Sequence, residues 1–243
     1  MSTAATMDGR TEFLPRRTAR LTGLFFLLTI LLGVFAQSFV SERLIAFDSA
    51  SRTASNILAN EGLFRLAFTI YLIEMSCQIV MTVLFYRLLA PVNKTVALLG
   101  LVFGLIGCTI KALSRLFFFA PLLVLKGAAY SSVFETAQLQ GLALLLLHVN
   151  DRGAAMALAF FGFENVFEGW LMIKSTFFPR VLGILSVIGG LGWLTFLSPS
   201  LGYRLFLYVA GFGLIASVVT IGYLLIVGLN EQRWREVAAW GGR

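Results

Sequence analysis

Three long runs that contain no Asp, Glu, Lys or Arg constrain the fold of this chain more than any other feature. They cover residues 21–41, 181–203 and 205–230. A helix needs about 20 apolar residues to cross the hydrocarbon core of a bilayer. Only helices and closed barrels satisfy their backbone hydrogen bonds in that environment. Each run therefore predicts a membrane-spanning helix.

Four further apolar runs are interrupted by isolated polar residues, and short polar segments rich in Pro, Gly and Asn separate the runs. The interrupted runs are 66–86, 95–125, 133–149 and 154–173, and the predicted connections are 90–94, 150–153, 177–180 and 198–202. Pro and Gly in such segments favour turns. The sequence predicts an all-α transmembrane bundle of about seven helices, with an N-terminal tail (1–19), a seven-span domain (20–229) and a C-terminal tail (230–243).

Composition supports a lipid environment and argues against several other classes of protein. Apolar side chains make up 58% of the chain and charged ones only 13%, whereas soluble domains carry about 25% charged residues. The net charge of +7 comes from single basic residues between apolar runs, which indicates membrane lipids and no nucleic acid as partners. Cys77 and Cys108 lie in apolar runs and His148 is the single histidine, so we expect no cofactor, metal or disulfide.

The basic residues before the first run favour an N-terminus in the cytoplasm. Arg16, Arg17 and Arg20 precede the run directly, and cytoplasmic loops carry an excess of Lys and Arg. Over seven spans the basic residues on the two sides are nearly balanced, so this prediction depends on the first helix. A signal peptide cleaved after Ala36 is the alternative, because an apolar run ending in small residues follows the arginines.

Charged and amide side chains inside the runs point to one polar layer. Glu164 and Glu168, like Lys111 and Arg115, are spaced so that each pair shares one helix face. At about 1.5 Å per residue, these residues reach similar depths in the outer half of the bilayer. An ionised residue at the centre of a membrane helix costs about 2.5–3.5 kcal/mol, so the glutamates are expected to face the two bases. The predicted ligand-binding residues are Glu74, Lys111, Arg115, Gln138, Glu164 and Glu168.

Three classes of function remain open for this layer. Its charges can bind a small polar or anionic amphipathic ligand, as in a transporter or a receptor. They can also form a structural ion-pair cluster in a regulatory membrane partner. No Ser–His pair lies at a depth that would suggest an intramembrane serine protease, so the less favoured third class is an enzyme that uses Glu164 or Glu168 as a general base near Lys111 or Arg115.

Several segments resemble a known family. They include "NILANEGLFRL" (56–66), "LFYRLLAPVNKTVALL" (84–99), "FETAQLQGLALLLL" (134–147), "AFFGFENVFEGWL" (159–171) and "STFFPRVLGIL" (175–185). Together they are similar to the family catalogued as domain of unknown function 4386. The resemblance implies a multi-pass protein of the bacterial inner membrane without an established activity. Gln78 and Gly104 stand where that family often has an acidic residue and an arginine.

Overall fold

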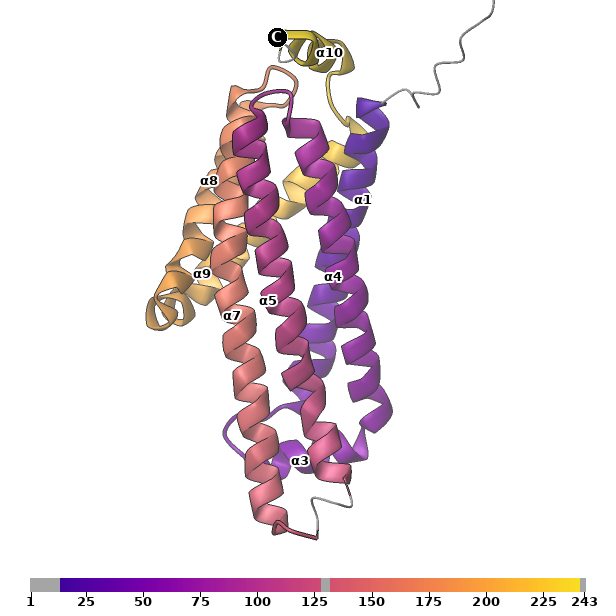
Figure 1. Ribbon diagram of the computed structural model, residues 1–243, viewed down its shortest axis with the longest axis vertical. Coiled ribbons are helices and arrows are strands. Elements are labelled where there is room, and N and C mark those ends of the chain that lie inside the picture. Colours follow the sequence, from indigo (N-terminus) through magenta and orange to yellow (C-terminus); the bar gives the residue numbers. More distant parts are fainter. Residues whose placement is uncertain (1–13, 128–131, 241–243) are drawn as a thin grey trace, which may run out of the picture.

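The computed structural model describes residues 14–127 and 132–240, and this part of the chain contains helices and no strand (Figure 1). The helical elements are α1 (Pro15–Val34), the π-helix η1 (Phe35–Ser41), α2 (Glu42–Leu44), α3 (Ala50–Ala59), α4 (Glu61–Leu89), α5 (Lys94–Lys126), α7 (Thr136–Lys174), α8 (Arg180–Trp193), the 3-10 helix η2 (Leu194–Leu197), α9 (Pro199–Ile226) and α10 (Glu231–Trp240). The predicted all-α bundle is confirmed.

Six segments within the described residues are long and apolar enough to cross a membrane. They are Pro15–Leu44, Glu61–Leu89, Lys94–Lys126, Thr136–Lys174, Arg180–Leu197 and Pro199–Ile226. The chain is therefore a multi-pass membrane protein. Its first segment runs without a break through the π-helix, and Ala36, the alternative cleavage position, is fully buried within it.

The predicted connection at 150–153 is wrong, because α7 continues through it as one helix of 39 residues. Tertiary contacts account for the polarity that suggested a turn. Asn150 is buried and accepts a hydrogen bond from Arg115, and Asp151 accepts one from Tyr203. Gly153 packs so closely on Ser114 that a Cβ there would lie 2.7 Å from the Ser114 Cβ. Two predicted spans are thus one helix about 58 Å long.

Helices end close to the other three predicted connections, although at 198–202 only Ser198 lies outside the helices and residues 199–202 belong to α9. Asn93 caps α5 by accepting a hydrogen bond from the Val96 amide at 3.0 Å, a typical N-cap contact. Pro179 directly precedes α8 and Pro199 is the first residue of α9, a position that proline suits. Pro121 lies inside α5, and the helix continues to Lys126.

Glycines bring α7 against both of its neighbours, α5 and α8. A Cβ at Gly107 of α5 would meet the Phe161 ring at 2.7 Å. On the other side, a Cβ at Gly190 of α8 would lie 2.7 Å from the carbonyl oxygen of Gly162. Close backbone approach at small residues is a common packing mode in membrane bundles. It holds α5, α7 and α8 side by side (Figure 1).

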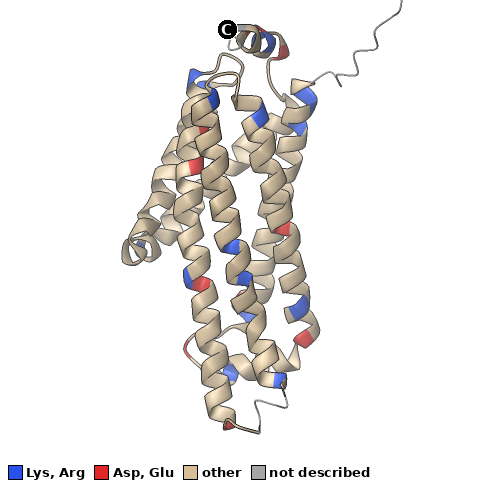
Figure 2. Cartoon of the chain, in the orientation of Figure 1, with Lys and Arg blue, Asp and Glu red and all other residues tan. Residues whose placement is uncertain are grey.

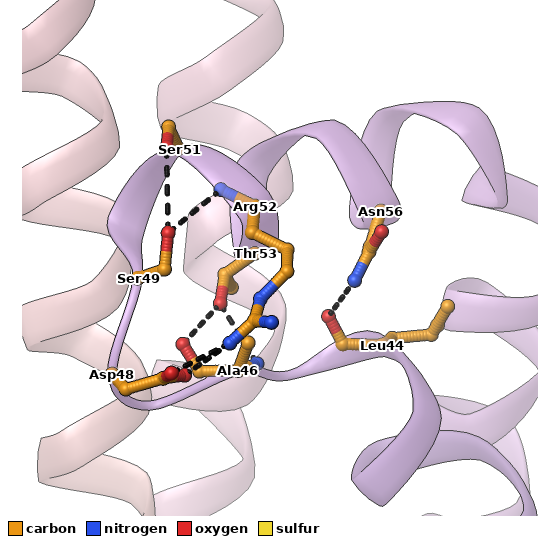
Figure 3. Close-up of polar contacts among 8 residues, drawn as sticks. All are labelled: Leu44, Ala46, Asp48, Ser49, Ser51, Arg52, Thr53 and Asn56. Atoms are coloured by element: carbon orange, nitrogen blue, oxygen red, sulfur yellow. Dashed lines mark hydrogen bonds and ion pairs between the residues drawn. The ribbon is translucent and has the colours of Figure 1, made fainter.

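The segment between α1 and α4 forms no separate domain and closes one end of the bundle. Ile57 of α3 and Leu44 are buried against α4, α5 and α7. Figure 3 shows the polar contacts that hold this segment: Asn56 donates to the Leu44 carbonyl, and Thr53 bonds to both backbone groups of Ala46. The Arg52 guanidinium also donates to both Asp48 oxygens at 2.6 Å, which holds the pKa of Asp48 below its ordinary value.

Two apolar clusters occupy the two ends of the bundle and leave a polar layer between them. The cluster near the start of α1 takes residues such as Phe85, Leu88 and Leu171. The cluster beside α3 is built around Phe64 and Phe118. Both described chain ends, α1 and α10, lie at the first of these ends (Figure 1). The candidate site therefore lies within the bundle, between two well-packed regions.

Candidate functional site

Isolated charges occur on α4, α5 and α7 well away from the helix ends (Figure 2). One pair joins two helices directly: Lys111 Nζ of α5 lies 2.8 Å from Glu74 Oε1 of α4. The Glu74 side chain is only 2% exposed and that of Lys111 is 18% exposed. Gly33 of α1 covers the same carboxylate, because a Cβ there would lie 3.8 Å from Glu74 Oε1. The structure thus places Glu74 and Lys111 together as predicted.

Arg115, one turn further along α5, has a different set of partners. It is 5% exposed, and its Nη1 donates to Asn150 Oδ1 at 3.1 Å. Its guanidinium carbon lies 3.7 Å from the centroid of the Tyr71 ring, a cation–π contact. Among the described residues no carboxylate lies within ion-pair distance of Arg115, and its Nε has no hydrogen-bond partner. A buried positive charge is thus held by neutral groups.

Tyr71 extends this contact to the π-helix. Its hydroxyl donates to Gln37 Oε1 at 3.0 Å and lies 2.9 Å from Ser41 Oγ. Because the one hydroxyl proton goes to Gln37, Ser41 is the donor in the second bond. π-Helical turns occur often at functional sites. Here the turn aims two polar side chains of η1 at the tyrosine that stacks on Arg115.

Glu164 and Glu168 lie apart from both bases. Each is buried, at 3% and 8% exposure, and Thr82 of α4 donates to Glu164 Oε1 at 2.7 Å. They face two glycines of α5: a Cβ at Gly104 would overlap the Glu164 carboxylate, and one at Gly100 would lie 3.7 Å from the Glu168 Cγ. Within residues 14–127 and 132–240, neither glutamate forms an ion pair with Lys111 or Arg115. The contact predicted from the sequence is therefore absent.

Gln138 does not belong to the layer. It lies in the first turn of α7, exposed to solvent, and its Oε1 accepts a hydrogen bond from the Glu135 amide at 2.9 Å as part of a capping box. The depth predicted for it depended on a separate span beginning at residue 133. Because α7 is one long helix, Gln138 lies near the end of the bundle instead.

Four residues of the site were missed from the sequence: Gln37, Tyr71, Thr82 and Asn150. Helical spacing could have found two of them, because Tyr71 and Thr82 follow the face of α4 that carries Glu74 and Gln78. Asn150 was assigned to a turn. Gln37 is directed inward by the π-helix, and no residue pattern signals that turn.

A cavity of about 150 Å³ opens beside the Arg115 contacts. Its wall includes Ser41, Phe118 and Asn150, which are buried, and its rim carries Glu42 and Asp151. The remaining lining residues are Gln37, Ile45 and Phe47. A shallower hollow of about 420 Å³ continues from Glu42 and Phe47 across to Arg52 and Asn56. Asn150 therefore contacts Arg115 on one side and the cavity on the other.

A family model described as "Domain of unknown function (DUF4386)" matches residues 21–228. The chain belongs to this DUF4386 family. The matched range contains the six candidate membrane spans apart from the first six residues of the first one. It also contains all the residues of the polar layer. No curated protein and no solved structure matches the chain. The activity of this DUF4386 protein must therefore be argued from the site itself.

Gln78 and Gly104, at which the sequence resemblance leads us to expect a departure from the family pattern, are both buried in the bundle. Gln78 is buried on α4, between Glu74 and Thr82. Gly104 forms the surface against which the Glu164 carboxylate packs. An arginine at 104 would fill the space that Glu164 occupies. The glutamate environment of this chain thus depends on the glycine.

Proposed function

We propose that this DUF4386 protein is a transporter or receptor of the bacterial inner membrane that binds a small polar amphipathic solute carrying an acidic group. The binding site is the cavity between η1, α5 and α7. One observation carries the proposal: a buried arginine, held by Tyr71 and Asn150 without a contacting carboxylate among the described residues, lies directly behind the cavity wall.

Arg115, which lies behind the cavity wall and contacts Asn150, favours an acidic group as the part of the ligand that is bound deepest, although the charged residues of the lining itself, Glu42 and Asp151, are both acidic. A buried guanidinium that contacts no carboxylate attracts an anion, and arginine binds carboxylate and phosphate groups well. The wall offers hydrogen-bonding side chains at Ser41 and Asn150 beside the apolar Phe118. Ligand sites commonly combine apolar walls with a few polar groups. Glu42 and Asp151 at the rim favour ligands whose outer part is neutral or basic.

A thermal-shift series on the purified protein in lipid nanodiscs tests this function. The probes are butyrate, butyramide and butylammonium, which share a carbon chain and differ in charge. We expect butyrate to raise the unfolding temperature most, because a ligand at ten times its Kd stabilises by about 1.4 kcal/mol. The Asn150→Ala variant should lose this shift. The matched control is Arg65→Gln, which removes a partly exposed arginine that is paired with Glu61.

Equal shifts with all three probes would contradict the proposal, as would a butyrate shift that persists in both Asn150→Ala and Arg115→Gln. If butyrate binds, uptake of labelled butyrate into proteoliposomes separates a transporter from a receptor. Accumulation that depends on Arg115 identifies a transporter. Binding without accumulation identifies a receptor.

A further inference from the structure

We propose that Glu164 and Glu168 form a proton-binding pair inside the membrane, in which the two carboxyl groups hold an exchangeable proton between them. This site is separate from the solute cavity. It lies toward the other end of α7, beyond the Lys111–Glu74 ion pair. The inference therefore goes beyond the proposed function, and either can fail without the other.

The first argument is geometric. Glu164 and Glu168 are one helical turn apart, so their side chains project from the same face of α7. Gly100 and Gly104 of α5 have the same spacing and lie opposite them. A Cβ at Gly104 would overlap the Glu164 carboxylate. The two glycines thus leave a recess that the two acids fill.

The second argument is the state of Glu168. Its side chain is more than nine-tenths buried, at 8% exposure, and within the described part of the chain no hydrogen bond or ion pair reaches it. Its Cγ lies against Gly100. A buried polar group without a partner is costly, and a carboxylate is costlier still. A bound proton removes the charge.

The third argument concerns the charges on the surrounding helices. On α4, Thr82 donates to Glu164, and Glu74 is already paired with Lys111 of α5. Cys108 of α5 is uncharged as a thiol and buried. No described base lies within 4.0 Å of either glutamate. Two buried carboxylates one helical turn apart, without a base, cannot both ionise at low cost, and neighbouring acid pairs share a proton in known enzymes.

The ends of the adjacent helices carry the remaining charged groups. They are Arg87 near the end of α4, Lys94 at the start of α5, Lys174 at the end of α7 and Arg180 at the start of α8, and all four are exposed. Glu168 lies six residues before Lys174, which corresponds to about 9 Å along the helix. Glu168 is therefore the nearer of the two acids to the water at this end of the bundle. Glu164 lies one turn deeper.

Infrared spectroscopy of the full chain in lipid nanodiscs tests the pair. At about pH 7 exposed carboxyl groups are ionised, so we expect a carbonyl band of a buried carboxylic acid that shifts in D₂O. Glu168→Gln removes a like charge from beside Glu164 and should change the proton affinity of Glu164 by at least tenfold, seen as a shift in the pH at which the band disappears. Glu164→Gln should shift the titration of Glu168 in the same direction.

Two control variants keep the assignment specific. Glu61→Gln changes a partly buried carboxylate that is paired with Lys126. Glu74→Gln changes a buried carboxylate that is paired with Lys111. Both variants should leave the band in place. Absence of the band at neutral pH would overturn the proposal, and so would a band that neither Glu164→Gln nor Glu168→Gln alters. A band that sodium chloride removes and choline chloride retains would replace the proton by a sodium ion, and would also overturn it.

Discussion

The two buried acidic regions of this bundle are neutralised in different ways. Glu74 has an ammonium group at 2.8 Å, whereas Glu164 and Glu168 face two glycines and a threonine hydroxyl. Both sets lie on helices of similar composition and both are almost fully buried. The difference teaches that the opposing residue decides the role of a membrane-buried carboxylate: a lysine makes it a structural ion pair, and a glycine leaves it dependent on a proton.

The largest effect is expected from breaking the structural pair. Lys111→Met leaves the Glu74 carboxylate buried without its base, which should lower the free energy of unfolding by about 3–5 kcal/mol. Unfolding by SDS titration in mixed micelles measures this loss. The double variant Lys111→Met, Glu74→Leu should recover most of the stability, because neither charge remains. A loss below about 1 kcal/mol would show that Lys111 extends to water and that the pair contributes little.

A smaller effect is expected when Gly104, the glycine that faces Glu164, is replaced. Gly104→Ala places a methyl group in the space of the Glu164 carboxylate and should cost about 1–3 kcal/mol through overpacking. Gly141→Ala is the matched control, because nothing lies within 4 Å of a Cβ there. Alanine favours the helix by up to about 1 kcal/mol at such a position. Equal stabilities of the two variants would show that the recess is loose.

The smallest effect is expected at an exposed ion pair, Arg52–Asp48, where water weakens the interaction that buried carboxylates depend on. The hydrogen bonds from Arg52 lower the pKa of Asp48 from its ordinary value of 3.8. A carboxyl whose pKa is lower in the folded state stabilises the fold above its unfolded pKa, and this contribution is lost as pH falls through the folded pKa. Arg52→Gln should raise the pKa of Asp48, as followed by carbon NMR of the carboxyl group. An unchanged pKa would contradict the contact.

Helix positions were predictable from the sequence wherever proline or charge-free length decided them. The connections at 90–94, 177–180 and 198–202 contain proline, which cannot continue a preceding helix without strain. The segment "NDRG" (150–153) has no proline, and each of its four residues finds a partner or a packing contact in α5 or α9. Polar residues inside a helix cannot be told from a turn until those contacts are known.

The sequence predicted which residues belong to the candidate site better than it predicted which of their side chains contact each other. Five of the six predicted residues lie inside the bundle, although at two levels along α7, because charged residues in apolar runs must face the interior. Which charges meet depends on helix rotation and on small residues that carry no charge. The Glu164 carboxylate packs against Gly104 instead of meeting a base, and the π-helix turns Gln37 toward Tyr71. Neither effect follows from spacing within one helix.

Because α7 is one continuous helix, the chain has a different expected orientation in the membrane from the one predicted for seven spans. With one crossing fewer, both described ends lie on the same side, and nine basic residues gather there: Arg16, Arg17, Arg20, Arg87, Lys94, Lys174, Arg180, Arg233 and Arg235. The opposite side carries six, namely Arg43, Arg52, Arg65, Lys126, Arg152 and Arg204. A balanced count thus becomes an asymmetric one. Loops rich in Lys and Arg remain in the cytoplasm when a membrane protein is inserted. Both tails of the chain are therefore expected to be cytoplasmic, and the solute cavity then opens toward the outside of the cell.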